Sequence, residues 1–243
     1  MEIADKVALV TGGGVRVGRA IALGLAEAGA DVVITYNSSA GPAQEVVAEI
    51  EALGRRSLAL QADFSQSAQM APLVDEITAA MGRLDILINS AAIFQQGDWD
   101  DTTERNWDLH FAINLKAPFF LSQAFAKHVK ASEHRGQIVN IADWRAVRPG
   151  KDHVAYTLTK AGLVAMTKSL ALALAPEVQV NAIAPGLILP PPGADEAFVE
   201  RKAAEIPLQR SGSPQAIVDA VRYLVASDFV TGELVFVTGG EHL

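Results

Sequence analysis

Short runs of β-branched and apolar residues alternate with longer segments of helical period, and this alternation restricts the fold of the chain more than any other feature. Most runs expected to be strands are followed by a segment with apolar residues at helical spacing. Such an order is typical of βαβ units, in which crossover helices join parallel strands. The run LDILIN at residues 84–89 is apolar on both faces, as a central parallel strand must be. The sequence therefore predicts an α/β layer fold.

The predicted elements are placed by residue number. The expected strands span residues 7–11, 31–36, 57–62, 84–89, 137–141, 178–184 and 234–237. The expected helices span residues 17–28, a segment ending near 54, 70–81, a segment with Trp107, Phe111, Asn114 and Phe119, a segment opening just before Tyr156, 195–205 and 214–227. The three prolines in residues 187–193 (LILPPPG) exclude regular helix or strand there. No linker interrupts this order, so we expect a single domain over residues 1–243, with a cofactor half at about 1–100 and a catalytic and substrate half at about 101–243.

Composition excludes several classes of function. The net charge of -8 argues against a broad basic face for nucleic acid. The absence of cysteine rules out disulfides and thiolate chemistry. No signal peptide is evident, and no apolar run approaches the roughly 20 residues of a membrane span. The five histidines show no pair at ligand spacing with a carboxylate, so no metal site is expected. We expect a soluble, cytoplasmic protein that binds neither nucleic acid nor membrane.

A glycine-rich turn, TGGGVRVG at residues 11–18, separates the first expected strand from the first helix. Glycines in such a turn let the backbone approach a pyrophosphate, which rests on the free amides of the helix N-terminus. The turn therefore predicts a dinucleotide site. Arg16 would lie beside the phosphates, or else be a solvated surface arginine. The expected cofactor-binding residues of this turn are Thr11, Gly12, Arg16, Val17 and Gly18.

The end of the second expected strand indicates which dinucleotide is bound. An NAD enzyme offers Asp or Glu to the ribose there, whereas this chain offers only neutral residues. Neutral donors near Arg16 suit a 2′-phosphate, so NADPH is predicted over NADH; alternatively, these residues simply make the turn. The expected contacts are Tyr36, Asn37, Ser38 and Ser39 with the ribose phosphate, Asp63 and Phe64 with the adenine, and Asn89, Ser90 and Ala91 where the fourth strand meets the cofactor. Asn89 could equally cap its strand.

The stretch at residues 140–160 carries the candidate chemistry. Tyr156 and Lys160 are four residues apart on an expected helix, so their side chains leave the same face. An ammonium beside a phenol favours the phenolate, so we expect a lowered pKa for Tyr156 and a proton donor that works near neutral pH. Asp143, at the end of the preceding strand, is expected to face this phenol, with a raised pKa if it is buried there. The alternative is that Asp143 caps the following loop.

These motifs together resemble the short-chain dehydrogenase/reductase family over the whole chain. The similarity rests on TGxxxxxG at 11–18, NSAA at 89–92, Asn114, YxxxK at 156–160 and PG at 185–186. It implies a Rossmann-like, doubly wound parallel sheet of about seven strands with helices on both faces, usually in a homotetramer, and hydride transfer from a nicotinamide. It also implies that Tyr156 donates the proton, that Lys160 holds the ribose and tunes Tyr156, and that Asn114 supports a proton-relay water. Pro185 and Gly186 are implied cofactor contacts.

Two departures from the family pattern resemble its pteridine reductase branch. The family serine thirteen residues before the tyrosine is replaced by Asp143, and the middle glycine of the turn by Arg16. Phe94, in SAAIF at 90–94, matches the phenylalanine that sandwiches the pterin against the nicotinamide, although it could be a plain core aromatic. His153 departs from that branch, which often has an aromatic hydroxyl there. The implied substrate-binding residues are Arg16, Phe94, Asp143 and Tyr156.

The chemistry of a carboxylate agrees with that branch. Asp143 would repel a developing oxyanion but would accept hydrogen bonds from the ring N–H and amino groups of a pterin. The first hypothesis is an NADPH-dependent reductase of a pterin-like C=N substrate, with Asp143, Tyr156, Lys160 and Asn114 as catalytic residues. The second is a carbonyl reductase of the 3-oxoacyl-[acyl-carrier-protein] reductase type. The third is a catalytically idle NADP-binding sensor or scaffold. The loop at 187–198 is either a lid or a dimer contact, and the apolar helix at 162–174 is expected at a subunit interface.

Overall fold

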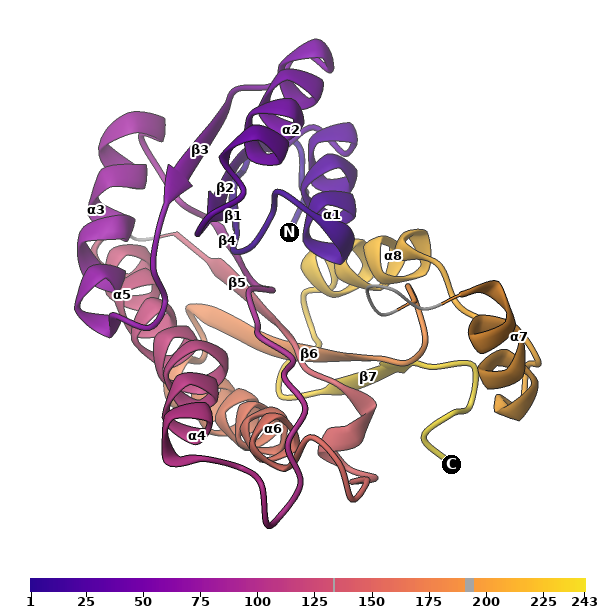
Figure 1. Cartoon of the computed structure of the whole chain (residues 1–243). Coiled ribbons are helices and arrows are strands. Elements are labelled where there is room, and N and C mark those ends of the chain that lie inside the picture. The colour runs from indigo at the N-terminus through magenta and orange to yellow at the C-terminus, as the bar shows by residue number, and fades with distance from the viewer. Residues whose placement is uncertain (133, 191–194) are drawn as a thin grey trace.

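The computed structural model describes residues 1–132, 134–190 and 195–243 (Figure 1). Within these residues the strands form one sheet of seven, in the order β3-β2-β1-β4-β5-β6-β7. Each pair of neighbouring strands is parallel. The strands are β1 (Val7–Val10), β2 (Asp31–Tyr36), β3 (Ser57–Gln61), β4 (Ile86–Asn89), β5 (Gly136–Ile141), β6 (Val178–Pro185) and β7 (Leu234–Val237). The predicted fold, a doubly wound parallel sheet, is confirmed.

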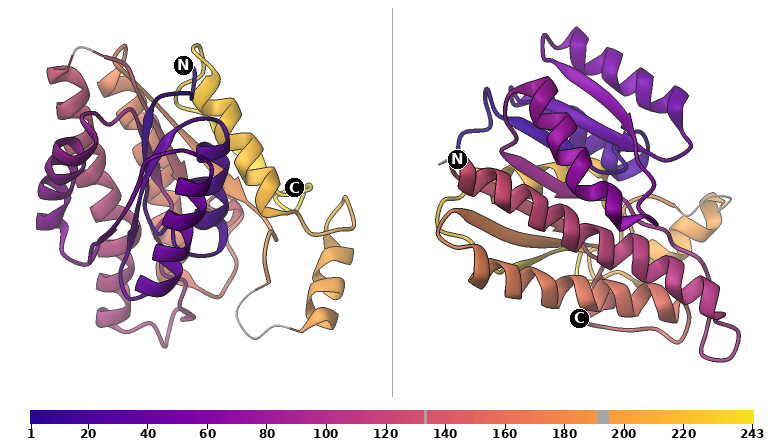
Figure 2. Two further views of the ribbon diagram at one scale, coloured as in Figure 1. Left: turned by 90° about the horizontal axis from the view of Figure 1, so that it is seen from above. Right: turned by 90° about the vertical axis from the view of Figure 1, so that its left-hand side faces the viewer.

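Helices cover both faces of this sheet (Figure 2). They are α1 (Arg16–Glu27), α2 (Ala40–Ala52), α3 (Met70–Met81), α4 (Glu104–Phe111), α5 (Ala117–Ala131), α6 (Val154–Leu174), α7 (Glu196–Glu205) and α8 (Pro214–Ala226). One face carries α1, α2 and α8, and its core includes Ile21, Val46 and Ile217, all fully buried. The other face carries α3, α5 and α6, and its core includes Ile77, Phe125 and Ala171. The two cores hold the strand ends in place from opposite sides.

Most predicted elements are found close to their expected bounds. β2, α3 and β7 have the bounds that the sequence predicts, because their apolar periods are uninterrupted and turn residues flank them. β5 ends at Ile141, as predicted for the strand at residues 137–141, although Asp143 was also expected at the strand end. Asp143 instead caps a 3-10 turn at Trp144–Ala146, which begins the loop to α6. This short turn decides where the Asp143 carboxylate points.

One predicted helix contains an irregular segment. The stretch from α4 to α5 passes through a π-helical turn, Ala112–Lys116, which includes Asn114. Such wide turns insert an extra residue into a helix and often occur at functional sites. The apolar period of the sequence predicted a helix there but did not reveal the π turn.

The segment after β6 is only partly described. Residues 187–190 are neither helix nor strand, as predicted, and residues 191–193 of the predicted irregular stretch lie outside the described residues. No helix within residues 1–132, 134–190 and 195–243 combines the length and apolar character needed to cross a membrane.

Candidate active site

A cavity of about 440 Å³ lies along the carboxyl ends of the strands. It reaches from the β2 end, at Tyr36 and Asn37, to the β6 end, at Pro185 and Gly186. The strand order reverses between β1 and β4, and in open parallel sheets ligands bind at such a point. The cavity therefore occupies the place where the fold offers a binding site.

The glycine turn has the backbone that the dinucleotide prediction requires. Gly12 has a positive φ of 66°, which other residues adopt only at a cost. A Cβ on Gly18 would lie 2.3 Å from the Gly12 carbonyl oxygen, so only glycine fits the crossing of turn and helix. The N-cap of α1 is Val15, whose aliphatic side chain offers no acceptor to the first amides of the helix. Those amides face the cavity and fit an anionic phosphate group.

Arg16 lines the cavity and begins α1 with a positive φ of 52°. Its guanidinium Nη2 donates a hydrogen bond to the carbonyl oxygen of Pro190 at 3.0 Å. The side chain therefore bridges the glycine turn to the segment that follows β6. It is exposed to solvent, and it places a cation at the phosphate end of the cavity.

The cavity wall at the ends of β2 and β3 is neutral except for Asp63. Within the described part of the chain, the lining includes Tyr36 and Asn37 but not Ser38 or Ser39. Ala62, Asp63 and Phe64 also line it, and the contact of Asp63 and Phe64 with the adenine stays a prediction. Hydrogen bonding from the Ser65 side chain, then from the Ser65 amide and from Gln66, holds the pKa of Asp63 below its ordinary value. Asp63 therefore stays a carboxylate that can accept from an amino group.

Two of the predicted cofactor-binding residues do not line the cavity but make hydrogen bonds behind its wall. Thr11 is buried, and its Oγ1 accepts hydrogen bonds from the amides of Ser90 and Ala91, both at 2.9 Å. Asn89 is also buried, and its Nδ2 donates to Asn140 Oδ1 at 2.8 Å. The Thr11 side chain thus fixes the loop after β4, and the Asn89 side chain links the end of β4 to β5. Ser90 and Ala91 line the cavity.

At the other end of the cavity, Tyr156 and Asp143 form a direct pair. The Tyr156 hydroxyl donates to Asp143 Oδ2 at 2.8 Å, and Asp143 Oδ1 accepts from the Arg145 amide at 2.8 Å. One carboxylate oxygen therefore caps the turn and the other faces the phenol. Asp143 therefore has both of the roles that the sequence left open: it faces the Tyr156 phenol and it caps the following loop.

Burial changes the proton affinities of this pair. Removal from water raises the pKa of Asp143 above its ordinary value, although the Arg145 amide, Tyr156 and Lys160 oppose the rise. The pKa of Tyr156 lies well above 10, first because the phenol is buried and then because Asp143 disfavours a phenolate. The predicted rise for Asp143 is confirmed, and the predicted lowering for Tyr156 is wrong. A carboxylate at 2.8 Å and the loss of water outweigh the more distant ammonium.

Lys160 lies one helical turn beyond Tyr156 on α6, with only 3% of its surface exposed. Its Nζ donates to the carbonyl oxygen of Ile141 at 2.7 Å and lies 5.6 Å from the centre of the Tyr156 ring. Burial lowers the pKa of Lys160 to about 8, against an opposing effect of Asp143. Lys160 thus lines the cavity beside Tyr156 without touching the phenol oxygen.

The π turn places Asn114 against the loop after β4. Asn114 Oδ1 accepts from the Ile93 amide at 2.9 Å, and Nδ2 donates to the Ile93 carbonyl at 3.0 Å. This side chain is 1% exposed and fixes the backbone of a cavity-lining residue. Its role with a relay water stays a prediction.

Phe94 follows the cavity-lining residue Ile93 and packs against Tyr156, but it is not among the described residues that line the cavity. Its ring meets the Tyr156 ring edge to face, with 4.7 Å between centres, and stacks on the His153 ring at 4.1 Å. Phe94 remains 51% exposed, so it is not a plain core aromatic. Sequence reasoning placed Phe94 here but treated His153 as a loop residue.

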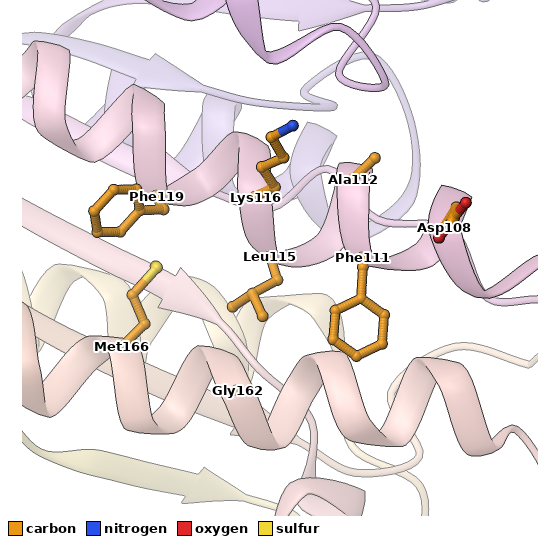
Figure 3. Close-up of a pocket in the computed structure, with 8 residues that line it drawn as sticks. All are labelled: Asp108, Phe111, Ala112, Leu115, Lys116, Phe119, Gly162 and Met166. Carbon is orange, nitrogen blue, oxygen red and sulfur yellow. The ribbon is translucent and has the colours of Figure 1, made fainter.

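A second cavity, of about 680 Å³, shares none of its described lining residues with the first (Figure 3). It runs between α6 and the stretch from α4 to α5, and Figure 3 shows Phe111, Leu115, Phe119 and Met166 around it. None of the predicted site residues is among the described residues that line it. Apart from Asp108 and Lys116, its described lining is apolar or glycine and offers packing surface.

Comparison with known proteins identifies the fold family. Residues 14–242 match the family model described as enoyl-(acyl carrier protein) reductase. The chain is 36% identical to 2-dehydro-3-deoxy-D-gluconate 5-dehydrogenase of Escherichia coli (strain K12) over 98% of this chain and 96% of that protein. The chain belongs to the short-chain dehydrogenase/reductase family.

Solved structures of this family support the same assignment. FolM alternative dihydrofolate reductase 1 from Brucella canis, complexed with NADP, matches with a TM-score of 0.94 and 34% identity, over 99% of this chain and 95% of that chain. A short chain dehydrogenase from Burkholderia cenocepacia J2315, also in complex with NADP, matches with a TM-score of 0.92 and 36% identity over the whole of both chains. As a short-chain dehydrogenase/reductase, the protein is an NAD(P)-dependent oxidoreductase.

Two further residues near the chemistry of this short-chain dehydrogenase/reductase were missed at the sequence level. Glu241, near the C-terminus, accepts a hydrogen bond from the Leu187 amide at 2.8 Å through Oε2. Burial raises its pKa, and the charge of Asp143 adds to that rise. Arg145 Nη1 donates to Asp152 Oδ1 at 2.8 Å and so forms an ion pair beside the Asp143 turn. No spacing rule links Glu241 or Arg145 to Tyr156, because chain folding alone brings them together.

Proposed function

We propose that this short-chain dehydrogenase/reductase is an NADPH-dependent reductase of a flat, pterin-like C=N substrate of the dihydropteridine or dihydrofolate type. The observation that carries the proposal is the Asp143–Tyr156 pair, with 2.8 Å between Oδ2 and the phenol oxygen. A carboxyl group stands where ordinary ketone reduction needs a neutral hydroxyl donor. The site is therefore better suited to a substrate that itself carries hydrogen-bond donors.

The charge of the site supports a nitrogen heterocycle. A carboxylate at this position repels the oxyanion that develops when a ketone is reduced. The same carboxylate accepts hydrogen bonds from ring N–H and amino groups, and a 2-amino-4-oxo pterin presents both. Glu241 is near enough to Asp143 for their charges to interact, although it is not among the described residues that line the cavity. Such an environment favours amino-bearing rings over anionic ones.

The residues of the chain supply the proton and the orientation. When bound, NADPH supplies the hydride that reduces the carbon of the C=N bond. Tyr156, held neutral by its raised pKa, carries the proton that the nitrogen takes up, so one C–H and one N–H bond replace the C=N double bond. In the proposed complex Asp143 accepts from the substrate ring, and the Tyr156 hydroxyl, which donates to Asp143 Oδ2 in the structure, turns its proton to the substrate nitrogen. Lys160 then stabilises the phenolate that remains, because its ammonium is close and buried.

The comparisons agree with this proposal without singling it out. FolM alternative dihydrofolate reductase 1 shares the fold closely, with a TM-score of 0.94. Other relatives of similar identity are named for different substrates, such as 2-dehydro-3-deoxy-D-gluconate. The 3-oxoacyl-[acyl-carrier-protein] reductase type is therefore retained as a second candidate. A catalytically idle sensor is disfavoured, because Tyr156, Lys160 and Asn114 are all retained and buried at the site.

A substrate comparison tests the reaction. We expect NADPH oxidation with dihydrobiopterin at least tenfold faster, in kcat/KM, than with a β-ketoacyl thioester. Absorbance at the NADPH band measures both reactions in the same buffer. Turnover of the thioester alone would remove the pterin proposal and leave the family chemistry in place. Tight NADPH binding without turnover of either compound would favour the sensor or scaffold.

The cofactor end favours NADPH over NADH. The β2 end of the cavity presents Tyr36 and Asn37, and Arg16 supplies the cation at the phosphate end. We expect Arg16→Asn to weaken NADPH binding about tenfold, since charge-assisted hydrogen bonds contribute roughly 1.5–3 kcal/mol. Asparagine tolerates the positive φ at this position, so the turn should keep its shape. Fluorescence titration of NADPH and NADH measures the effect.

Two controls accompany this substitution. NADH affinity should stay within about twofold, because NADH lacks the 2′-phosphate that Arg16 is proposed to hold. Arg19→Gln, on the same helix, should leave both affinities unchanged, because Arg19 pairs with Glu49 at 2.7 Å on the solvent side. Equal loss of NADPH and NADH affinity in Arg16→Asn would contradict a specific contact with the 2′-phosphate.

We further propose that the protein assembles as a homotetramer. The apolar walls of the cavity in Figure 3 lie along α4, α5 and α6, the last of which is the helix predicted at an interface. Exposed apolar side chains on the same helices, such as Phe119 and Leu158, would be covered by a second copy. Sedimentation velocity separates a tetramer from a monomer.

A further inference from the structure

A closed series of side-chain contacts begins and ends at Tyr156. Tyr156 bonds to Asp143, whose turn includes Arg145, and Arg145 pairs with Asp152 at 2.8 Å. Asp152 Oδ2 lies 3.1 Å from His153 Nδ1. The His153 ring stacks on Phe94, which completes the series of contacts by meeting Tyr156. Two routes of contacts therefore connect Asp143 to Phe94. One passes through Tyr156, and the other passes through Arg145, Asp152 and His153.

His153 is held in place more firmly than a loop histidine needs to be. It has a positive φ of 55° at the N-cap of α6, and its side chain is only 14% exposed. The next residue, Val154, donates its amide to the carbonyl of Gly97 at 2.8 Å. That bond joins the start of α6 to the loop that carries Phe94. The two rings lie 5° from parallel, with 4.1 Å between their centres.

The position of Phe94 needs such support. Phe94 is 51% exposed and lies in a loop, so it has few neighbours of its own to fix its orientation. A flat ring at 4.1 Å covers one of its faces and limits its rotation. Phe94 also meets the Tyr156 ring edge to face, and Tyr156 in turn donates to Asp143, while half of the Phe94 surface stays exposed.

We propose that His153 is a specificity-determining positioning residue, which stacks behind Phe94 so that the open surface of Phe94 packs against a flat heteroaromatic substrate ring. This inference rests on the proposed function and names the element that selects a flat ring. His153 acts through Phe94 and not on the reacting atoms. Asp152 Oδ2 lies 3.1 Å from the imidazole without a hydrogen bond to it, and Asp152 is itself paired with Arg145 of the Asp143 turn.

A matched pair of substitutions tests the role of the ring. His153→Phe keeps a flat ring, whereas His153→Asn removes the ring and keeps a residue that tolerates a positive φ. The probe is oxidised biopterin, titrated into the NADP⁺-saturated protein. We expect His153→Asn to weaken its binding about three- to tenfold, and His153→Phe to stay within about twofold of the native chain. NADPH affinity should be unchanged in both variants, which also shows that they fold.

A double-substitution cycle tests whether the effect passes through Phe94. Phe94→Leu should weaken biopterin binding, and adding His153→Asn to it should cause no further loss. In steady-state turnover of dihydrobiopterin, His153→Asn should raise KM and leave kcat within about twofold.

Several outcomes would overturn the proposal. One is an equal loss of biopterin affinity in His153→Asn and His153→Phe, and another is a loss in His153→Asn that adds to the loss in Phe94→Leu. Tighter biopterin binding in His153→Asn, or no biopterin binding by the native chain, would also contradict it. Biopterin binding that depends on the ring at position 153, without turnover of dihydrobiopterin, would support the role of His153. That result would contradict the proposed reaction instead.

Discussion

Tyr156→Phe is expected to lower turnover by a factor of about 10²–10⁴, because it removes the group proposed to deliver the proton. The substitution deletes one oxygen from a residue that is 7% exposed, so the ring still fills its place. NADPH affinity should stay within about twofold. Steady-state rates of NADPH oxidation and a fluorescence titration of NADPH measure the two quantities.

The structure also predicts a side effect of Tyr156→Phe. In the native chain the hydrogen bond from the phenol lowers the pKa of the Asp143 carboxyl, and the variant loses this bond. We therefore expect the pKa of Asp143 to rise further in the variant. Tyr223→Phe, on the exposed face of α8, is the matched control and should leave activity unchanged. Native-like turnover in Tyr156→Phe would remove Tyr156 from the proton transfer.

Asp143→Ser is expected to reverse the substrate preference of the enzyme. Turnover of dihydrobiopterin should fall about 100-fold, since two charge-assisted hydrogen bonds of roughly 1.5–3 kcal/mol each are weakened. Reduction of a β-ketoacyl thioester should be unchanged or faster, because a hydroxyl stabilises an oxyanion where a carboxylate repels it. Serine can still accept from the Arg145 amide, so the turn at Trp144–Ala146 should persist. The ratio of kcat/KM for the two substrates is the measurement.

The pH dependence separates the charge of Asp143 from its shape. Lys160 has a pKa lowered to about 8 by burial, and Asp143 opposes that lowering. Asp143→Asn keeps the shape and removes the charge, so the pKa of Lys160 should fall further. If the ammonium is needed, activity is present below this pKa and lost as the pH rises through it. The alkaline limb of kcat/KM should thus move to lower pH in Asp143→Asn. An unmoved limb, or improved pterin turnover in Asp143→Ser, would contradict the proposed role of the carboxylate.

Local sequence patterns were sufficient for the fold and for much of the site. The apolar runs set the strands because parallel strands buried on both faces need continuous apolar side chains. Tyr156 and Lys160 could be paired from spacing alone, since residues four apart share a helix face. Gly12 and Gly18 could be placed because a phosphate turn requires a backbone without a Cβ.

Other features depend on contacts between segments that are distant in the sequence. The pKa of Tyr156 is raised, whereas the sequence predicted that it would be lowered. The burial of the phenol and the 2.8 Å distance to Asp143 cause this rise, and both follow from packing. Ser38 and Ser39 adjoin the predicted ribose site in sequence, yet within the described residues the cavity wall includes Asn37 and not these serines. Glu241 comes near Asp143 only because the C-terminal turn folds back on the segment after β6.

The sequence by itself therefore determined the parallel α/β fold, the glycine turn after β1 and the residues that are proposed to carry the proton chemistry. Each of these follows from a local rule of period or spacing. The tertiary structure decided the electrostatics of the Asp143–Tyr156 pair and the stacking of His153 on Phe94. Both depend on the water that folding removes and on the distances between separate loops, and no local pattern in the sequence specifies either.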